Sequence, residues 1–466
     1  MRSVSIVSIV CITYVLSLLV GCANIVPPGG GPKDSLPPIL IQALPKDSSL
    51  QFNAKKIQLV FNEFVEVKEA QQQLVVSPFP KNQPQIDYKL RTITILLKDS
   101  LQENTTYSLD FGQSVRDINE GNILKNFTYL FSTGNQLDKG TIKGKVTLAE
   151  TGKYDSTLLV VLHSNLADSA IEKNRPNYIA KVDGKGQFQF KYLPSVPFNV
   201  YVVPNDFSKK YDDSTKLFAF HPITITPKQE NDTLVPLDLW AYEAYKKKEK
   251  PKPAPAKPTP TKAVPSLKYQ VNFDNGRQDI LKPLELIFSN PLAPIDSQSI
   301  VLCDTFYQPI KGYRVQLDTS LLKVSVNYPW KEQQHFKLLI NREHIADTAG
   351  ITINKNDTVA IVTKAESEYG SVKLRFLNLN ANNTQPVLQI LENGNIIESV
   401  VLINNEFKRK LFKPGEYELR ILFDTNKNAI WDPGNYAKKL QPEQVKAISQ
   451  KLSVRANWDN ENDYQL

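Results

Sequence analysis

One short segment near the C-terminal end carries oxygen-bearing side chains at a spacing that suits a hard divalent cation. Asp424, Asn426, Asn428 and Asp432 occupy the first, third, fifth and ninth positions of a calcium-loop pattern. The match is incomplete, because alanine stands at the sixth position, where such a loop needs glycine, and asparagine at the twelfth, where it needs a bidentate glutamate. The loop is therefore only a weak Ca²⁺ candidate. The alternative is a loop closed by Asp and Asn side chains that bond to the backbone.

The remaining reactive side chains do not assemble a catalytic pattern. The four histidines lack the His-x-His or His-Glu-x-x-His spacing of metal sites. The chain has no Gly-x-Ser-x-Gly motif and no phosphate-binding glycine loop. Glu63 and Glu66 can share one face of a strand, but nothing marks a substrate cleft beside them. We therefore predict a protein that is not an enzyme, needs no cofactor and has no firm metal site.

The first 22 residues predict a lipid anchor. Arg2 supplies a positive start, residues 4–20 form an apolar stretch, and Leu19-Val20-Gly21-Cys22 has the form of a lipoprotein cleavage site. We predict a signal peptide at residues 1–21, lipidation of Cys22, and a Pro- and Gly-rich tether at residues 22–36. The first predicted partner is therefore the membrane itself, which the N-terminal lipid binds.

The residues around the lipidated cysteine bear on location and on disulfides. Ala23 disfavours retention at the inner membrane, and no acidic residue of the kind that directs surface export occurs before Asp34. We predict an outer-membrane lipoprotein, with the periplasmic face slightly favoured over the cell surface. Cys303 is then the only cysteine besides Cys22 in the mature chain, so no intrachain disulfide is expected. Its apolar neighbours predict a buried strand residue.

Alternation of apolar and polar residues predicts an all-β fold. The chain has 466 residues, 41% of them hydrophobic and 22% charged, which suits about three to four folded domains. Short β-branched runs recur, and no helical pattern separates them. The first of these runs are residues 56–61, 92–96, 107–111 and 128–131. Strands at this spacing are typical of β-sandwiches of roughly 100 residues.

Two types of sandwich are indicated by resemblance. Residues 37–134 resemble the bacterial Ig-like domain of S-layer proteins and envelope lipoproteins. The residues that carry this resemblance are Pro37-Pro38, the strand 57–61 with Asn62-Glu63-Phe64 after it, Asn104-Thr105-Thr106-Tyr107, and the turn 117–121 before the last strand. Residues 140–242 resemble a carboxypeptidase regulatory-like, or prealbumin-like, β-sandwich, on the basis of Gly186-Gln187-Phe188-Gln189-Phe190 and Leu193-Pro194. The second resemblance implies an accessory domain without peptidase residues.

The second half of the chain repeats the first at a spacing of about 230 residues. Residues 284–291, 335–338 and 347–350 correspond to 57–64, 106–109 and 117–121, and residues 370–374 and 413–419 correspond to the start and the Leu-Pro turn of the second sandwich. We predict a second, diverged Ig-like sandwich at 267–363 and a second prealbumin-like sandwich at 368–466. A loop similar to Asp424–Gly434 is found in prealbumin-like domains of envelope lipoproteins, which favours a loop closed by Asx turns and pinned by Trp431.

A Lys/Pro-rich linker at residues 246–266 separates the two predicted halves. Residues 246–262 hold seven Lys and one Glu, and so carry most of the net charge of +8. Pro restricts the backbone and like charges repel, so at about 3.1 Å per residue the linker would hold the halves up to roughly 50 Å apart. The alternative is a polybasic contact with lipid A phosphates or other anionic envelope polymers. Nucleic acid is not a predicted partner, because no basic face interleaves with aromatic residues.

Aspartate is followed by Ser or Thr more often than chance allows. This holds for 13 of the 26 Asp residues, whereas composition predicts about three. Many of these sites resemble the Asp-Ser/Thr-aliphatic O-glycosylation acceptor of Bacteroidota envelope proteins. The resemblance implies modification at Ser35, Ser100, Ser156, Ser169, Ser214, Thr233, Thr348 and Thr358. Turn chemistry is the alternative, since Asp and Ser both bond to nearby backbone, and both explanations can hold together.

These observations favour a non-enzymatic lipoprotein that acts as a modular scaffold or a protein-binding subunit of the cell envelope. Membership of an outer-membrane assembly or secretion complex fits this class by analogy. The alternative function is glycan binding in adhesion or polysaccharide capture. In that case Trp330, Trp431 and Trp458 are the candidates to stack on sugars, although most of them are expected to be core or loop anchors.

Overall fold

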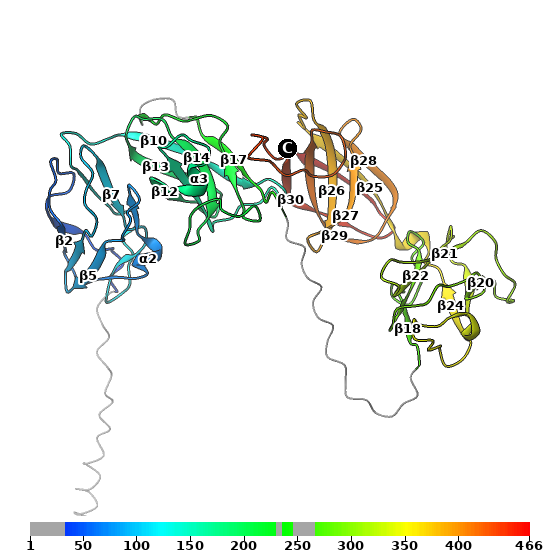
Figure 1. Ribbon diagram of the computed structural model, residues 1–466. Coiled ribbons are helices and arrows are strands. Elements are labelled where there is room, and N and C mark those ends of the chain that lie inside the picture. The colour runs from blue at the N-terminus through cyan, green and yellow to red at the C-terminus, as the bar shows by residue number, and fades with distance from the viewer. Residues whose placement is uncertain (1–32, 230–234, 246–265) are drawn as a thin grey trace, which may run out of the picture.

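The structure is a computed structural model, and it describes residues 33–229, 235–245 and 266–466. Within these ranges the chain is an all-β protein made of tandem β-sandwiches (Figure 1). None of the helices in these ranges is both long and apolar enough to span a membrane. The predicted signal peptide, Cys22, Thr233 and nearly all of the predicted linker lie outside the described residues.

Sandwich 1 consists of β1 (Leu40–Leu44), β2 (Lys56–Phe61), β3 (Val65–Val67), α2 (Ala70–Gln73), β4 (Val75–Ser77), β5 (Gln85–Lys89), β6 (Thr92–Leu96), β7 (Thr106–Asp110), β8 (Val115–Asp117) and β9 (Thr128–Ser132). Its main sheets have the strand orders β1-β2-β6-β5 and β4-β7-β9, and β3 pairs with β8. Ile57, Leu59 and Phe61 enter the core, because alternate side chains of a strand share one face.

Sandwich 2 consists of β10 (Gly140–Leu148), β11 (Leu158–His163), α3 (Ala170–Lys173), β12 (Tyr178–Lys181), β13 (Gln187–Leu193), β14 (Asn199–Pro204), β15 (Ala219–Phe220), β16 (Lys228–Gln229) and β17 (Leu237–Ala241). One sheet has the order β12-β11-β14-β15, and β10 is central to the other. All six residues of β11 are buried. Val160 and Leu162 face the core between the sheets, whereas Leu159 and Val161 belong to a second apolar cluster on the outer face.

Sandwich 3 consists of β18 (Tyr269–Val271), β19 (Leu284–Phe288), β20 (Ile300–Cys303), β21 (Arg314–Leu317), β22 (Lys323–Asn327), β23 (His335–Ile340), η1 (Arg342–His344) and β24 (Asp357–Val362), and η2 (Glu366–Glu368) follows it. Its sheets have the orders β18-β19-β22-β21 and β20-β23-β24. Cys303 is fully buried in β20, as predicted, and burial followed by the nearby charge of Asp304 raises the pKa of its thiol.

Sandwich 4 consists of β25 (Gly370–Leu377), β26 (Gln385–Glu392), β27 (Asn395–Val401), β28 (Glu406–Phe412), β29 (Gly415–Asp424), β30 (Gln444–Val454) and β31 (Asp459–Gln465). Its sheets have the orders β28-β25-β31 and β27-β26-β29-β30. Its main core lies between the two sheets. A smaller cluster of Val387, Leu422 and Val445 lies outside that core and contacts Trp431.

The strand orders repeat between the halves. Sandwiches 1 and 3 each pair a four-stranded with a three-stranded sheet, and the sequential positions of the strands within them correspond. Sandwiches 2 and 4 share a rarer feature, because the last strand of each runs parallel to the first: β17 beside β10, and β31 beside β25. The internal repeat seen in the sequence is thus also a repeat of topology.

The spatial order of the sandwiches differs from their order in the sequence (Figure 1). Sandwich 1 contacts sandwich 2, where the Phe79 N–H donates to Asn177 O at 2.6 Å. Sandwich 3 likewise contacts sandwich 4, where Tyr369 Oη donates to Asp279 at 2.7 Å. However, sandwiches 2 and 4 also contact each other, so sandwich 4 lies between sandwiches 2 and 3. The prediction that the linker keeps the two halves apart is therefore wrong, because apolar outer faces remain on both and bury each other.

Candidate functional site

The contact between sandwiches 2 and 4 is held by buried polar atoms. The N–H of Val445 donates to Ala149 O at 2.9 Å, which joins β30 to the end of β10. The hydroxyls of Tyr201 and Tyr436 lie 3.0 Å apart. Tyr436 Oη donates to Asp168 O, also at 3.0 Å, and therefore accepts from Tyr201. Burial raises the pKa of both Tyr436 and Tyr201, so the two hydroxyls stay neutral.

Aromatic packing surrounds these hydrogen bonds. The Tyr436 ring meets Phe218 and Phe220 edge-on, each at a centroid distance of 5.2 Å. Gly434 lies so close to Tyr242 that a Cβ at this position would be 2.6 Å from the ring. Trp431 packs on this cluster of sandwich 2 and on the small outer cluster of sandwich 4. Residues of the loop 424–440 thus join the two sandwiches.

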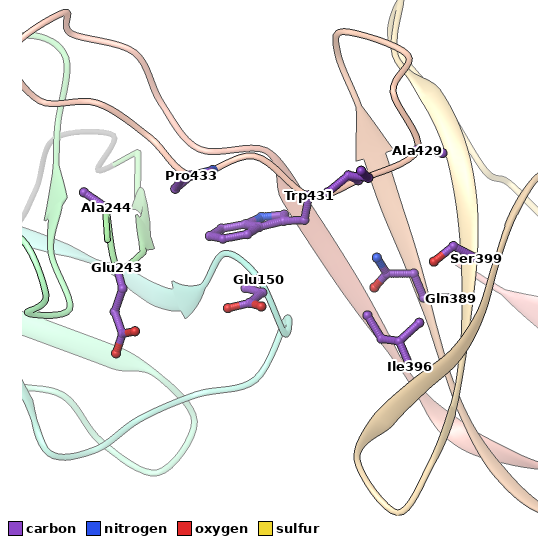
Figure 2. A pocket seen from close by; sticks show the side chains of 10 residues that line it. Glu150, Glu243, Ala244, Gln389, Ile396, Ser399, Ala429, Trp431 and Pro433 are labelled. Atoms are coloured by element: carbon purple, nitrogen blue, oxygen red, sulfur yellow. The ribbon is translucent and has the colours of Figure 1, made fainter. Parts of the chain in front are cut away.

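A cavity of about 400 Å³ opens beside this contact. Figure 2 shows Trp431 at its centre, with Glu150 and Glu243 of sandwich 2 on one side and Gln389 and Ile396 of sandwich 4 on the other. The indole N–H of Trp431 donates to Glu443 O at 2.8 Å, which fixes the orientation of the ring. The cavity therefore combines a fixed aromatic surface with carboxylate and amide groups from two sandwiches.

Two buried polar side chains, Gln389 in the cavity lining and Arg420 next to the lining residue Glu150, have unused hydrogen-bonding capacity among the described residues. Gln389 is only 3% exposed, and its Oε1 has no hydrogen-bond partner there. Arg420 is 8% exposed, and its Nη1 donates to Glu150 O at 3.2 Å while its Nε has no partner. Burial lowers the pKa of Arg420, and the charges of Glu150 and Glu418 oppose that shift. Buried acceptors without a partner are uncommon and point to a missing ligand group or water.

A second cavity, of about 500 Å³, lies between sandwiches 1 and 2, but its lining residues Asp99 and Arg175 already have partners. Asp99 accepts the backbone N–H groups of Lys81 and Asn82. Arg175 donates to the carbonyls of Pro80 and Lys81 and lies over the ring of Phe79. This cavity therefore lies at a contact between the two sandwiches in which these side chains already have partners.

The predicted calcium-loop residues lie together, and they bond to one another and to the backbone. Both carboxylate oxygens of Asp424 accept backbone N–H groups, from Lys427 and Ala429. The amides of Asn426 and Asn428 both donate to Asp432 Oδ2, at 2.7 and 2.8 Å. These contacts are those of the Asx-turn interpretation. Among the described residues no cluster of three or more His, Cys, Asp or Glu is arranged to hold a metal. Ca²⁺ binding by this loop stays a prediction.

The three candidate tryptophans have different environments. Trp330 is 6% exposed and packs edge-on against Phe336 inside sandwich 3, so it cannot stack on a sugar. Trp458 is 62% exposed, with the Arg455 guanidinium over its ring. Trp431 is half-buried and is the one that borders the cavity. Sequence reasoning missed Glu150, Glu243 and Gln389, because no local pattern tells which distant surfaces meet.

The Asp-Ser/Thr sites are mainly on the surface and often in turns. Seven of the eight predicted acceptors are described, and all but the half-buried Ser169 are exposed. Several of the aspartates accept the N–H of the second residue after them, as in an Asx turn. These are Asp34, Asp155, Asp213, Asp296, Asp304 and Asp347. Turn chemistry therefore accounts for much of the excess, while glycosylation stays a prediction.

Comparison with known proteins identifies the first sandwich. A model of the bacterial Ig-like domain family matches residues 34–133. The protein is thus a tandem β-sandwich protein whose sandwich 1 is a bacterial Ig-like domain. The resemblance noted for residues 37–134 is confirmed, while the prealbumin-like resemblances stay predictions. Comparison with curated protein sequences gave no match.

Several solved structures show similarity to the chain. The Bacillus anthracis TIE protein is 11% identical, covering 94% of this chain and 76% of that one, with a TM-score of 0.17. BcpA, the major pilin subunit of Bacillus cereus, is 11% identical, covering 70% and 99%, with a TM-score of 0.18. The N-terminal part of the bacterial S-layer protein SbsC is 14% identical, covering 45% and 44%, with a TM-score of 0.16. At these scores the structures do not superpose over their lengths.

Proposed function

We propose that this protein is a non-enzymatic lipoprotein of the outer membrane that acts as a scaffold or protein-binding subunit of the cell envelope. The observation that supports the proposal is the contact between sandwiches 2 and 4, which joins four sandwiches into one extended body. Sandwich 1 presents β1 at the edge of its sheet, with Ile39 and Ile41 61% and 65% exposed. An exposed edge strand of this kind accepts a strand from a partner protein.

A cross-linking experiment tests the scaffold proposal. A photoreactive residue replaces Ile41 on β1, and a control replaces Ile403, which is 74% exposed but lies outside any strand. We expect the probe at position 41 to cross-link one defined envelope protein in living cells and the probe at position 403 to give none. Equal cross-linking from both positions, or none from position 41, contradicts the proposal.

The lipid anchor is tested separately. Cys22→Ser should move the protein from the membrane fraction to the soluble fraction and abolish labelling by palmitate. We further propose the periplasmic face, within an outer-membrane assembly or secretion complex. Proteinase K added to intact cells should then leave a C-terminal tag intact, and its degradation would place the protein on the cell surface.

Glycosylation at the eight Asp-Ser/Thr sites is a separate proposal. It is supported by the exposure of six of the described acceptor residues. The native protein should be heavier than its polypeptide plus lipid, and Ser→Ala or Thr→Val changes should remove the added mass stepwise. A mass equal to polypeptide plus lipid leaves turn chemistry as the full explanation.

Glycan binding is a second candidate function, which one observation favours. Trp431 borders a cavity that also contains carboxylate groups and the unpartnered amide oxygen of Gln389. Pockets at domain junctions with a few convergent polar groups are the usual form of small-ligand sites.

A further inference from the structure

We propose that the cavity between sandwiches 2 and 4 binds one neutral pyranose unit of a glycan, and that it exists only while the two sandwiches are docked. The proposal rests on the second candidate function and assigns its site and ligand class. Ten residues line the cavity, three of them from sandwich 2 or the segment directly after it and seven from sandwich 4. Neither sandwich alone therefore supplies the complete site.

Trp431 provides the stacking surface. The hydrogen bond from its indole N–H to Glu443 O holds the ring, and packing against both sandwiches limits its rotation. The face of an aromatic ring is the negative end of its quadrupole. It therefore attracts the C–H groups on the apolar face of a pyranose, and a fixed ring loses little entropy on binding.

The polar groups around Trp431 suit hydroxyl groups. Gln389 Oε1 is a buried acceptor without a partner among the described residues, and Figure 2 shows the amide directed toward the cavity. Glu243 adds a carboxylate acceptor from the segment after β17. Ser399 adds a hydroxyl, which both donates and accepts. A sugar hydroxyl likewise donates and accepts, so it can satisfy each of these groups.

Charge selects among the possible ligands. The carboxylates of Glu150 and Glu243 repel uronic acids and other acidic sugars. Arg420, buried behind Glu150 and hydrogen-bonded to its carbonyl, offsets part of this negative charge and so weakens the attraction for a cation. A neutral polyhydroxyl ligand is not repelled by the carboxylates, and its binding does not depend on a net negative charge in the cavity. The volume of about 400 Å³ accommodates a single small ligand unit.

Binding of defined oligosaccharides to the purified full chain tests the inference. The probes are the neutral hexamers of β-1,4-glucose, α-1,4-glucose, β-1,4-xylose and β-1,4-mannose, with oligogalacturonate as the acidic probe and hexalysine as the basic one. We expect tryptophan fluorescence to change and calorimetry to detect binding with at least one neutral probe. The acidic probe and hexalysine should not bind.

Variants locate the site. Gln389→Leu keeps the shape of the buried side chain but removes the amide, and should weaken binding about tenfold. Trp431→Ala should abolish binding, and Trp458→Ala, which removes the exposed tryptophan on the same sandwich, should leave it unchanged. Circular dichroism and thermal melting of Gln389→Leu show whether its fold is intact.

The outcomes separate the inference from the functions on which it depends. Neutral-glycan binding that Trp458→Ala removes and Gln389→Leu leaves intact refutes the site but keeps the glycan function. Absence of binding to all neutral probes refutes both the site and the glycan function, while the scaffold proposal depends on the cross-linking result. Preferential binding of hexalysine assigns the cavity to a basic peptide and overturns the ligand class.

Discussion

The hydroxyl groups of Tyr201 and Tyr436 lie 3.0 Å apart although 235 residues separate them in the chain. Tyr201 comes from β14 of sandwich 2, and Tyr436 comes from the loop between β29 and β30 of sandwich 4. The pair is buried, and the Tyr436 hydroxyl donates its own hydrogen bond to the Asp168 carbonyl. The two halves of the chain therefore share a specific interface, although the Lys/Pro-rich linker separates them in the sequence.

The contribution of this interface can be measured at Tyr436. Tyr436→Phe removes two hydrogen bonds and should weaken docking by about 1 kcal/mol. Tyr436→Ala also removes the ring from its aromatic neighbours and should cost about 3 kcal/mol. Hydrogen exchange of the Val445 amide, which bonds to Ala149 O across the interface, should accelerate in the same order. Tyr464→Phe is the control, because the Tyr464 hydroxyl is buried without a partner in the part of the chain that the structure describes, and its loss should leave this amide protected.

Gly152 tests whether close backbone approach is needed for docking. A Cβ at this position would lie 2.5 Å from Ala447 N and 2.6 Å from Val445 O of the other sandwich. Gly152→Ala should therefore separate sandwiches 2 and 4 and increase the radius of gyration measured by small-angle X-ray scattering. Gly394→Ala is the matched control, since both glycines have positive φ, +66° and +81°, but Gly394 has open space around it. Equal expansion in both variants would show that backbone strain, and not the interface, is responsible.

Cleavage of the linker gives a direct test of the docked arrangement. A protease site inserted within residues 246–265 allows the chain to be cut without altering the interface residues. Because sandwiches 2 and 4 bury aromatic side chains against each other, the two fragments should elute together in gel filtration after cleavage. Tyr436→Ala should make them separate. Two fragments that separate without any substitution would instead support halves that are independent of each other.

The fold class could be predicted from local patterns, but the interface could not. Alternation at Ile57, Leu59 and Phe61 predicted a half-buried strand, and those side chains are buried. The repeated turns at Asp117 and Asp347 also correspond, because each carboxylate accepts backbone N–H groups of the residues that follow it. These features depend on contacts between residues that are close in the sequence, or on the regular alternation of side chains along a strand.

Docking depends instead on surfaces that become neighbours only in the folded chain. A continuous apolar run such as that of β11 is typical of a strand buried on both faces, but the sequence does not identify what covers the outer face. The Lys/Pro-rich segment predicted separation, because its composition describes a solvated spacer and carries no information about the surfaces at its ends. For the candidate site, the one signal was Trp431, whose carboxylate and amide neighbours come from the other sandwich and from β26.

His163 is a titratable group that is buried in sandwich 2, so its protonation should affect stability. The side chain is fully buried in β11, it meets the ring of Tyr201 edge-on at 5.8 Å, and neither ring nitrogen has a partner among the described residues. Burial, reinforced by the positive charge of Lys210, lowers its pKa from 6.5 to about 4. Between pH 6.5 and pH 4 the unfolded chain therefore binds a proton at His163, whereas the folded chain does not.

Above pH 6.5, His163 is neutral in both states and does not reduce the free energy of unfolding. As the pH falls toward 4, the free energy of unfolding falls, because protonation of His163 favours the unfolded chain. The full loss is about 3 kcal/mol below pH 4. His163→Phe should remove this part of the pH dependence, while His335→Gln, at an exposed position on β23, should leave it in place. Urea unfolding from pH 4 to pH 7 measures the difference, and carboxylates that titrate in the same range cancel between the variants. The same slope in His163→Phe as in the natural chain would mean that His163 has the same pKa in the folded and the unfolded chain.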